Sequence, residues 1–545
     1  MNSRKNLLPA LRSSINSVGP AGLLLLVFLL YPCAALRAAA DFSDIYLSHD
    51  RYFYLVEERA RTSLNYHSFS TDRAGFDMNG NLQGRRTYYP VSGNGHTGLL
   101  YAPVETFITF NSAIAKGDND GALWQGRGLN SVVRGGIEYS CSWASVRFAP
   151  EIWGAQNRDF DIIDTEYSSG YGDYWTPFDR LQRYGEDPVY DFSFGKSDIR
   201  FYFLRHFTAG VSTETVTLGP GKITNIILSK NAEGFPHFDF GTSGAVPLFS
   251  LGMVEIRAMF GILRESDYFD NDSSNDFGWI SGLSAAWAPV FIRNFSFGFN
   301  YYYDKPMSGW DERDLIRFIP YLDASNPPGD QKDMMVSITF EWIFPSAGFT
   351  VYGEWARNDN FGDLSDLFAE PEHAQALTLG FSQRLNTLRD GAHLVLSGEF
   401  SNLGQERTLE RRPAGPWYRH AWAGWSQGHT NRGQVLGAGT GPGSNSQWLE
   451  LARVDNRGMQ AFRLQRISHD RDYFYKLFSE SGEYGNLECG VAEYTELYVA
   501  FASLLTAGRW DIFYEVGYSL LVNYNFEQGN TGHNIHLECG ARYNY

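Results

Sequence analysis

The strongest constraint in this sequence is a two-residue alternation of apolar and polar side chains that recurs along most of the chain. In the segment 510–520 every even position is a large apolar residue, whereas the odd positions include Asp511, Glu515 and Ser519. The same alternation recurs in three other stretches, namely 294–303, 336–344 and 392–400. Period-two alternation is typical of a β-strand whose two faces meet different surroundings. After the first 40 residues no run of about 18 apolar residues occurs, so we expect no membrane-spanning helix.

The last thirteen residues, 533–545, carry this alternation to the final position. One parity is apolar or small, and it consists of Ile535, Leu537, Cys539, Ala541, Tyr543 and Tyr545. The other parity is mostly polar, and it consists of Asn534, His536, Glu538, Gly540, Arg542 and Asn544. A final strand that ends on an aromatic residue resembles the signal by which outer-membrane barrels are recognised for insertion. We therefore expect the barrel-insertion machinery as a partner, and an apolar strand face toward outer-membrane lipid.

The N-terminus predicts export from the cytoplasm. Three basic residues precede a short apolar run, 23–30, and small residues follow at Ala38–Ala40. This order is typical of a secretory signal peptide, which we predict to span 1–40, with an uncleaved membrane anchor as the alternative. Residues 41–97 show little alternation, and we predict an N-terminal periplasmic extension with a short helix. Residues 98–545 are predicted to form a transmembrane β-barrel.

The lengths of the connections give an independent indication of this fold. From about residue 290 onward, short connections (345–348, 386–391, 455–458 and 506–508) alternate with long ones (305–332, 357–373, 404–446, 469–491 and 522–531). Outer-membrane barrels combine tight periplasmic turns with long external loops. Counting back from the C-terminus predicts an all-β, antiparallel barrel of the outer membrane with about 18 strands, or 16 as the alternative. A strand near 223–230 is part of this count.

Four charged residues lie in the middle of predicted strands, on their polar faces: Glu341, Glu399, Asp511 and Glu515. Carboxylates are costly to bury in a dry core, so we expect these residues to line a wet lumen. A polar lumen also leaves a porin-like transport channel as an alternative function.

Charge and motifs exclude several other classes of function. The formal net charge is −17, and it falls to −21 if the leader with its four basic residues is removed. Such an acidic protein is a poor nucleic-acid binder. The sequence lacks GxSxG, HExxH and P-loop motifs, so we expect no enzyme, no metal and no cofactor. A barrel hydrolase built on His393 or His536 is a minor alternative, and we expect a monomer.

Two further stretches have both a binding and a structural interpretation. Gly219-Pro220-Gly221, followed by Lys222, has the composition of an anion-binding nest, but a Pro-Gly turn explains it without a ligand. The acidic stretch 267–276 has oxygen ligands suited to calcium, yet it lacks the glycine and terminal glutamate of an EF-hand loop. We favour the turn and a solvated acidic loop.

Four groups of motifs resemble one protein family. They are 120–130 (DGALWQGRGLN), 218–221 with 231–237, 352–354 (YGE), and 417–420 with 433–437 (GQVLG) and 441–447 (GPGSNSQ). Together they resemble the Wzi-type capsule assembly proteins of the outer membrane, over roughly 100–545. The resemblance implies a barrel of about 18 strands with a small helical periplasmic element. It also implies a lectin-like role, the attachment or assembly of capsular or related surface polysaccharide, without catalysis.

The long connection 404–446 is the best candidate for polysaccharide binding. Its aromatic residues Trp417, Tyr418, Trp422 and Trp425 are suited to stacking on sugar rings. Its polar residues Arg419, His420, Arg432 and Gln434 are suited to bonding sugar hydroxyls or uronic carboxylates. The alternative is that the aromatic residues form an interfacial girdle or fold the loop over the barrel mouth. We expect this loop to face outward from the cell.

Overall fold

The computed structural model describes short N-terminal pieces and most of the chain from residue 98. The described residues are 75–76, 82–83, 89–93, 98–165, 168–204, 206–243, 245–270, 272–319, 332–344, 347–358, 372–388, 392–405, 415–419, 427–455, 458–480 and 490–543. The predicted signal peptide and nearly all of the predicted extension 41–97 lie outside these ranges, as do His420, Trp422 and Trp425.

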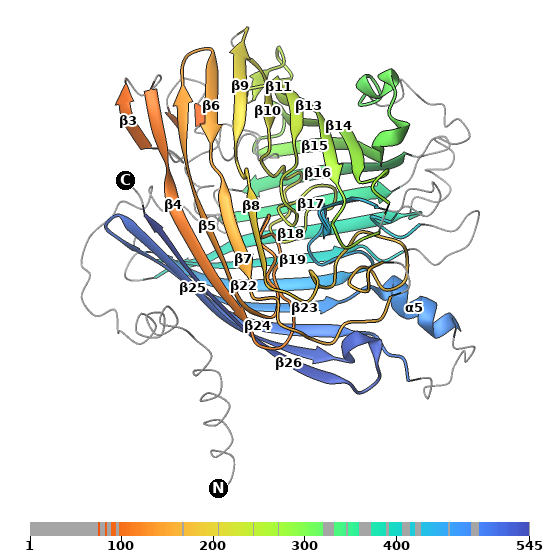
Figure 1. The fold of residues 1–545 in the computed structure, drawn as a ribbon. Coiled ribbons are helices and arrows are strands. Elements are labelled where there is room, and N and C mark those ends of the chain that lie inside the picture. Colours follow the sequence, from red (N-terminus) through yellow and green to blue (C-terminus); the bar gives the residue numbers. More distant parts are fainter. Residues whose placement is uncertain are drawn as a thin grey trace. The chain divides into compact units, whose positions relative to one another are not determined.

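Eighteen antiparallel strands form a closed barrel (Figure 1), in which three strands are interrupted and carry two labels each. The strands are β4 (Gly98–Asn111), β5 (Gly128–Ser140), β6 (Ala144–Phe148) with β7 (Glu151–Ala155), β8 (Val189–Ser193) with β9 (Asp198–Phe203), β10 (Phe207–Ser212), β11 (His237–Thr242) with β12 (Val246–Pro247), β13 (Gly252–Arg264), β14 (Phe277–Pro289), β15 (Phe295–Pro306), β16 (Asp333–Phe344), β17 (Phe349–Asn358), β18 (Gln375–Thr387), β19 (His393–Asn402), β22 (Asn445–Asp455), β23 (Gly458–Ser468), β24 (Thr495–Ala507), β25 (Trp510–Val522) and β26 (Thr531–Tyr543).

The remaining elements are short. They are the strands β1 (Gly75–Phe76), β2 (Leu82–Gln83), β3 (Tyr89–Gly93), β20 (Thr430–Asn431) and β21 (Gln434–Val435), the 3-10 turns η3 (Met307–Gly309), η4 (Glu312–Leu315) and η5 (Tyr524–Phe526), and the helix α5 (Arg471–Glu480). Within the described part of the chain, no helix is long and apolar enough to cross a membrane.

The C-terminal strand closes the barrel against the first one. β26 pairs with β4 in an antiparallel register that runs from His536 opposite Asn111 to Tyr543 opposite Val104. His536, Glu538 and Arg542 are buried in the barrel interior, and Ile535 on the other face is exposed. The orientation of the two faces predicted for this strand is therefore confirmed up to Tyr543, and the eighteen-strand prediction is confirmed with it.

One predicted strand is wrong. Residues 223–230 lie in the connection between β10 and β11, and the strand that pairs with β10 is β11. Ile226, Ile227 and Leu228 are fully buried in a hydrophobic cluster with inward-facing side chains of the barrel wall. The apolar run that mimics a strand is thus the core of a loop that folds into the barrel.

The outward face of the barrel is apolar around its whole circumference. In β24, for example, Leu497, Val499 and Phe501 point outward and are each about 40% exposed, whereas the intervening Glu496 and Tyr498 are buried inside. Short turns and long connections alternate from β4 to β26. Outer-membrane barrels keep their short turns in the periplasm, which places the long connections outside the cell.

Segments of the long connections fold into the lumen and pack against the wall. We call the inward-folded residues the plug: its first segment is 213–236, and its second consists of the described residues 415–419 and 427–444. Plug residues such as Leu218, Ile226 and Leu436 pack with wall residues such as Met259 and Met335 in one buried cluster. The expected wet surroundings of the mid-strand carboxylates are therefore wrong for three of them, since Glu399, Asp511 and Glu515 are almost fully buried.

The membrane-facing assignment of β24 predicts a depth-dependent effect of charge. Phe501 lies at the middle of the strand and faces outward. Replacing it with arginine places a cation in the hydrocarbon layer, and we expect a loss of about 2–4 kcal/mol in unfolding free energy measured by urea titration in lipid vesicles. Trp510→Arg, at the short-turn end of β25, is the matched control, with an expected loss below about 1 kcal/mol. Equal losses would contradict the assignment.

Candidate functional site

The first plug segment is held by a wall carboxylate that accepts several backbone hydrogen bonds. Glu399 of β19 accepts from the backbone N–H groups of Lys222 (2.7 Å), Ile223 (3.1 Å) and Thr224 (2.7 Å). The hydroxyl of Tyr352 on β17 donates to the same carboxylate at 2.8 Å. The amides that follow the Gly-Pro-Gly turn thus do bind an anion, and that anion is a side chain of the protein itself.

Two further wall residues fix the plug in place. Glu354 of β17 accepts from the backbone N–H of Ile226 at 3.0 Å. His429 is fully buried, and its Nδ1 lies 2.9 Å from Asp304 of β15 while its Nε2 lies 2.7 Å from the carbonyl of Ile227. His429 therefore connects the second plug segment both to the wall and to the first plug segment.

Trp417 and Tyr418 are structural residues of the plug in this arrangement. Both are 0% exposed. The hydroxyl of Tyr418 donates to the carbonyl of Ile226 at 2.6 Å and accepts from the N–H of Ala438 at 3.0 Å. The indole N–H of Trp417 donates to the carbonyl of Gln375 at 3.1 Å. The motifs at 218–221, 352–354 and 433–437, together with the described part of the motif at 417–420, are far apart in the sequence and meet in the lumen.

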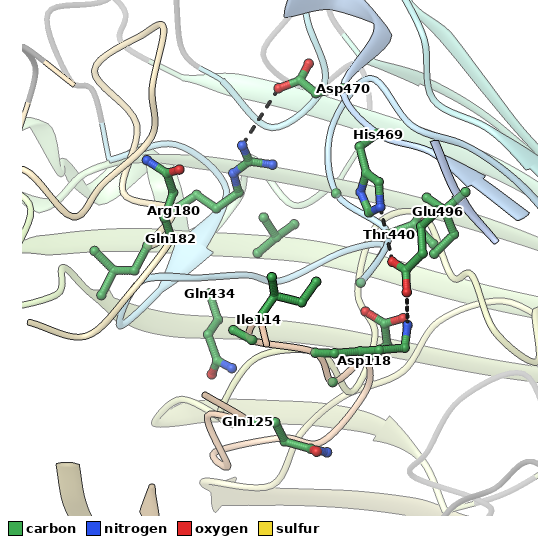
Figure 2. Close-up of a pocket in the computed structure, with 18 of the residues that line it drawn as sticks. Ile114, Asp118, Gln125, Arg180, Gln182, Gln434, Thr440, His469, Asp470 and Glu496 are labelled. Carbon is green, nitrogen blue, oxygen red and sulfur yellow. Dashed lines mark hydrogen bonds and ion pairs between the residues drawn. The ribbon is translucent and has the colours of Figure 1, made fainter. Parts of the chain in front are cut away.

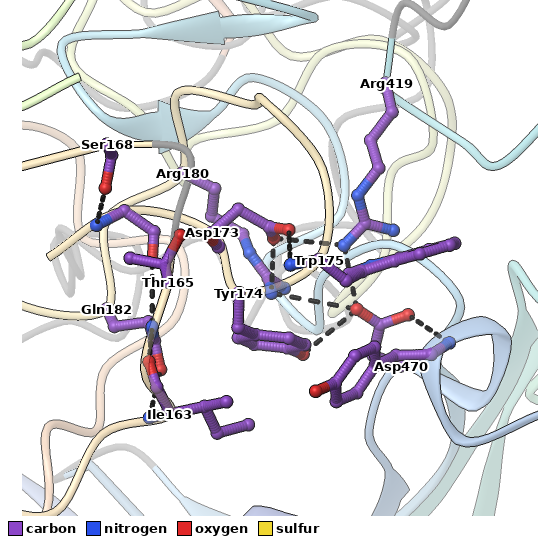
Figure 3. A network of polar contacts seen from close by, with 12 residues as sticks. Ile163, Thr165, Ser168, Asp173, Tyr174, Trp175, Arg180, Gln182, Arg419 and Asp470 are labelled. Carbon is purple, nitrogen blue, oxygen red and sulfur yellow. Dashed lines mark hydrogen bonds and ion pairs between the residues drawn. The ribbon is translucent and has the colours of Figure 1, made fainter. Parts of the chain in front are cut away.

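A buried cluster of two arginines and two aspartates joins three long connections (Figure 3). Asp173 contacts Arg180 at 2.9 Å and Arg419 at 3.0 Å, and Asp470 contacts Arg419 at 2.8 Å. Tyr174 donates its hydroxyl to Asp470 at 3.0 Å. Burial alone would raise the pKa of Asp470, but the guanidinium groups of Arg419 and Arg180 hold that pKa below its usual value. The cluster is neutral overall and fixes the loops around the barrel mouth.

A pocket of about 290 Å³ opens among these loops at the external end of the barrel (Figure 2). Its lining comes from the connections 112–127, 156–188, 427–444, 469–494 and 523–530, together with residue 231 of the plug and the strand residues Ile467 and Glu496. Aromatic rings contribute Trp124, Tyr174, Tyr494, Tyr524 and Phe526. Polar groups contribute Lys116, Asp118, Asp120, Arg180, Gln434 and His469. Concave sites with aromatic walls and a few polar groups are typical of small-ligand binding.

Two basic side chains of the pocket contact the same carboxylate. Lys116 Nζ lies 2.8 Å from Glu496, and His469 Nε2 lies 3.3 Å from the other oxygen of the same carboxylate. Burial by itself would lower the pKa of Lys116, yet the negative charges of Glu496 and Asp118 outweigh it and raise that pKa. Lys116 therefore stays charged and committed to Glu496.

The structure distributes the eight residues predicted for polysaccharide binding among different places. Gln434 lines the pocket. Arg432 is partly exposed and pairs with Glu233 at 2.9 Å and with Asp191. Trp417, Tyr418 and Arg419 are buried, so they support the loops instead of presenting a surface. His420, Trp422 and Trp425 lie outside the described residues, and the binding role of the whole set stays a prediction.

Most pocket residues were missed by the sequence analysis. Trp124 belongs to the motif 120–130, which gave a signal, but Lys116, Tyr174, Tyr494 and Tyr524 come from loops without a recognisable motif. Their proximity follows from the closure of the barrel and the inward folding of the loops. No local pattern in the sequence reports it.

The acidic connection 265–276 lies beside the plug. Among the described residues, no three His, Cys, Asp or Glu side chains are grouped so as to hold a metal ion. The absence of a metal from the protein stays a prediction. Glu265 is only 4% exposed, and burial together with the nearby charges of Asp270 and Asp179 raises its pKa to about 9. Asp179, which accepts from Ser266, has its pKa raised by burial to about 6.

The fold and its apolar outer face define a multi-pass outer-membrane β-barrel, and parts of its long connections pack against the inside of the wall. No family model matches the chain, and no curated protein matches it in sequence. Among solved structures it is similar to Wzi of Escherichia coli, described as an outer-membrane protein involved in group 1 capsule assembly and a carbohydrate-binding β-barrel. The TM-score is 0.54 at 11% identity, over 81% of this chain and 84% of that one.

Two Pseudomonas proteins match with lower scores. OprB of Pseudomonas putida has a TM-score of 0.37 at 10% identity, over 81% of this chain and 94% of that one. OprD of Pseudomonas aeruginosa has a TM-score of 0.37 at 9% identity, over 81% and 93%. At these identities the likeness concerns the fold alone. The barrel implied by the sequence resemblance is confirmed. The function has to be inferred from the residues of the candidate site.

The raised pKa of Glu265, which lies just beyond the end of β13, predicts a pH-dependent stability. The folded protein retains a proton that the unfolded chain releases near pH 4.5, so stability falls as pH rises from there toward 9. Glu265→Gln removes this penalty. We expect the variant to be more stable than the wild type at pH 8 by on the order of 1–3 kcal/mol, with little difference at pH 5. Denaturant titrations at both pH values measure it, with the exposed Glu527→Gln as control; a pH-independent difference would argue against a buried protonated carboxyl.

Proposed function

We propose that this protein is a polysaccharide-binding, lectin-like barrel that attaches or assembles capsular or related surface polysaccharide at the cell surface. The proposal includes membership of the Wzi-type class, a monomeric state, and no catalytic activity. It differs from the sequence-based hypothesis in the location of the site. The pocket among the external loops, with Gln434 in its lining, replaces the buried pair Trp417 and Tyr418 as the place of contact.

The observation that carries this proposal is the plug together with the pocket above it. The plug has a hydrophobic cluster and wall-bonded backbone, features of a permanent part of the fold. A long chain such as a polysaccharide needs a fixed external surface with shallow sites for single sugar units. A pocket of about 290 Å³ is comparable to the lower end of small-ligand sites, which suits one or two sugar rings.

The alternative is a porin-like transport channel. Barrels of 16–18 strands commonly enclose an aqueous passage, and the wall of this one carries charged pairs such as Arg463 with Glu450 and Arg200 with Asp239. We favour binding because charged wall residues that contact the plug, such as Glu399, accept hydrogen bonds from its backbone. They are therefore not exposed to a passing solute. A hydrolase is not proposed: His536 lies 2.9 Å from the side chain of Asn111, an arrangement that closes the barrel seam.

The pocket proposal predicts a selective effect of one lining residue. The side-chain amide of Gln434 makes no hydrogen bond to any described residue, so it is available to a ligand. We expect Gln434→Ala to weaken polysaccharide binding by roughly fivefold, since a ligand hydrogen bond is worth about 1 kcal/mol. Two measurements test this: solid-phase binding of the purified protein to surface polysaccharide, and the amount of polysaccharide retained on cells. Gln528→Ala, on an exposed loop outside the pocket, is the matched control; equal binding by both variants would refute the pocket as the site.

The plug inside the barrel predicts that the protein does not conduct ions. In planar bilayers we expect the purified protein to give no stepwise conductance of the size seen with open 16- to 18-stranded porins. Conductance from a general porin inserted under the same conditions is the control for bilayer quality. Reproducible open-channel steps that scale with protein concentration would favour the transport alternative over polysaccharide binding.

A further inference from the structure

We propose that a glycan linked to a membrane lipid reaches the external pocket from the side, through an interruption of the barrel wall between β8 and β13. This inference rests on the proposed function and specifies its ligand as a glycolipid, whose sugar chain enters while the lipid stays in the outer leaflet. In this structure the route is closed by the tip of the hairpin that β20 and β21 form. We call this tip, residues 431–433, the latch.

The two strands between β9 and β13 stop partway up the wall. β10 and β11 have six residues each, whereas β13 has thirteen. The chain leaves the wall after Ser212, enters the lumen as the first plug segment, and rejoins the wall at His237, the residue opposite Ser212. Among the described residues, β8 therefore pairs with β7 alone, and the external end of β13 pairs with no wall strand except β14. The ladder of the barrel is interrupted between these two edges.

The interruption lies at the depth of the membrane. Tyr190 and Phe192 of β8 are exposed on the outer face, as are Ile262 of β13 and Phe277 of β14. The apolar outer face thus continues up to both edges of the interruption. An open strand edge is costly in lipid, because its N–H and C=O groups have no water to bond. Other polar groups of the protein have to cover these edges.

Polar groups do occupy the interruption. The N–H of Phe192 donates to the carboxylate of Asp191 at 2.7 Å. The guanidinium of Arg432 connects Asp191 on β8 to Glu233 of the plug, and the backbone N–H of Arg432 donates to the carbonyl of Arg264 on β13 at 2.7 Å. Such surroundings suit the hydroxyls of a sugar chain and disfavour acyl tails. The lipid end of a glycolipid would therefore stay on the apolar outer face.

The latch is a two-residue turn whose conformation depends on its contacts. Arg432 and Gly433 have φ values of 53° and 84°, and positive values at both central residues are what a type I′ hairpin turn requires. Residues other than glycine rarely adopt this conformation, so the contacts of Arg432 with both edges hold it there. The side chain of Arg432 is 36% exposed, and a partly exposed ion pair contributes little to stability. The latch can thus leave the wall without disrupting the buried cluster of the plug.

Only one hairpin separates the interruption from the pocket. Gly433 and Gln434 line the pocket, whereas the preceding residue, Arg432, reaches β8. The first plug segment is arranged in the same way, because Asn231 lines the pocket and Glu233 contacts Arg432. Displacement of the latch therefore joins the pocket to the outer leaflet.

Photocrosslinking of the full-length protein in lipid nanodiscs tests the route. The probe is an oligosaccharide cut from the surface polysaccharide of the bacterium that makes the protein. It is used free in water, and also coupled to a phosphatidylethanolamine that carries a diazirine next to its headgroup. We expect the coupled form to label β8 and β13 at least about fivefold more than the remaining strands, and the free form to compete. The same lipid without sugar is the control, and we expect it to label the wall evenly.

The outcomes separate the two proposals. Even labelling by the coupled form, together with binding of the free oligosaccharide in the pocket, would overturn the lateral route and leave the proposed function intact. Binding of neither form would overturn both.

A variant of the wall tests the latch. Asp191→Asn removes the ion pair between the latch and β8 and keeps an oxygen that accepts from the N–H of Phe192. We expect the lipid-coupled oligosaccharide to associate roughly two- to fivefold faster, the range that a partly exposed ion pair supplies, and the free oligosaccharide to bind as it does to the wild type.

Asp455→Asn is the matched control, because it removes the partner of Arg453 at a short turn on the other side of the barrel. The exposed fractions of these two side chains, 35% and 20%, are close to the 36% and 29% of Arg432 and Asp191. An unchanged association rate in Asp191→Asn, or an equal increase in the control, would show that the latch does not close the route.

Discussion

The structure depends on hydrogen bonds between the backbone of the plug and the carboxylates of the barrel wall. A loop that enters the barrel carries N–H groups away from water, and each one left without an acceptor costs about 1–3 kcal/mol. Glu399 accepts from three consecutive residues of the plug, and Glu354 accepts from a fourth. The same contacts solve the converse problem, because a buried carboxylate is tolerated only when its oxygens are hydrogen-bonded. Loop and wall therefore stabilise each other.

Once the plug is anchored, the arrangement of the mouth follows. Tyr418 connects the two plug segments through Ile226 and Ala438, and the following residue, Arg419, enters the cluster with Asp173 and Asp470. That cluster fixes the connections on either side of the pocket, including the segment that carries Tyr174 and Arg180. The pocket is thus held by a chain of buried contacts that begins at the barrel wall, which gives its lining the rigidity a binding site needs.

The barrel itself could be predicted because its determinants are local. Period-two alternation and turn length depend only on residues that are close in the sequence. They predicted strands such as β24, β25 and β26 within a few positions of their observed bounds. The plug could not be predicted in this way. An inward carboxylate such as Glu399 has the same sequence pattern whether it meets water or backbone amides. The apolar run at 223–230 has strand-like composition because a buried loop also needs a core. Aromatic residues such as Trp417 occur in a long loop whether it turns outward or into the lumen.

The width of an eighteen-stranded barrel explains why so much depends on the connections. Side chains from the wall fill the interior of a barrel of about eight strands, but at 16–18 strands the lumen must be occupied by water or by chain. The number of strands thus sets the volume of the lumen, and the loops determine whether protein or water occupies it. Here the residues 156–165, 168–188, 213–236, 415–419 and 427–444 supply chain, and interior carboxylates such as Glu399 anchor backbone where an open barrel would use them to contact solutes. The same wall can accordingly support transport or surface binding, and the difference lies in the direction that its long loops take. The alternation of residues in the strands does not predict that direction. It is seen in the structure from Glu354 and Glu399, which accept hydrogen bonds from the backbone of the plug.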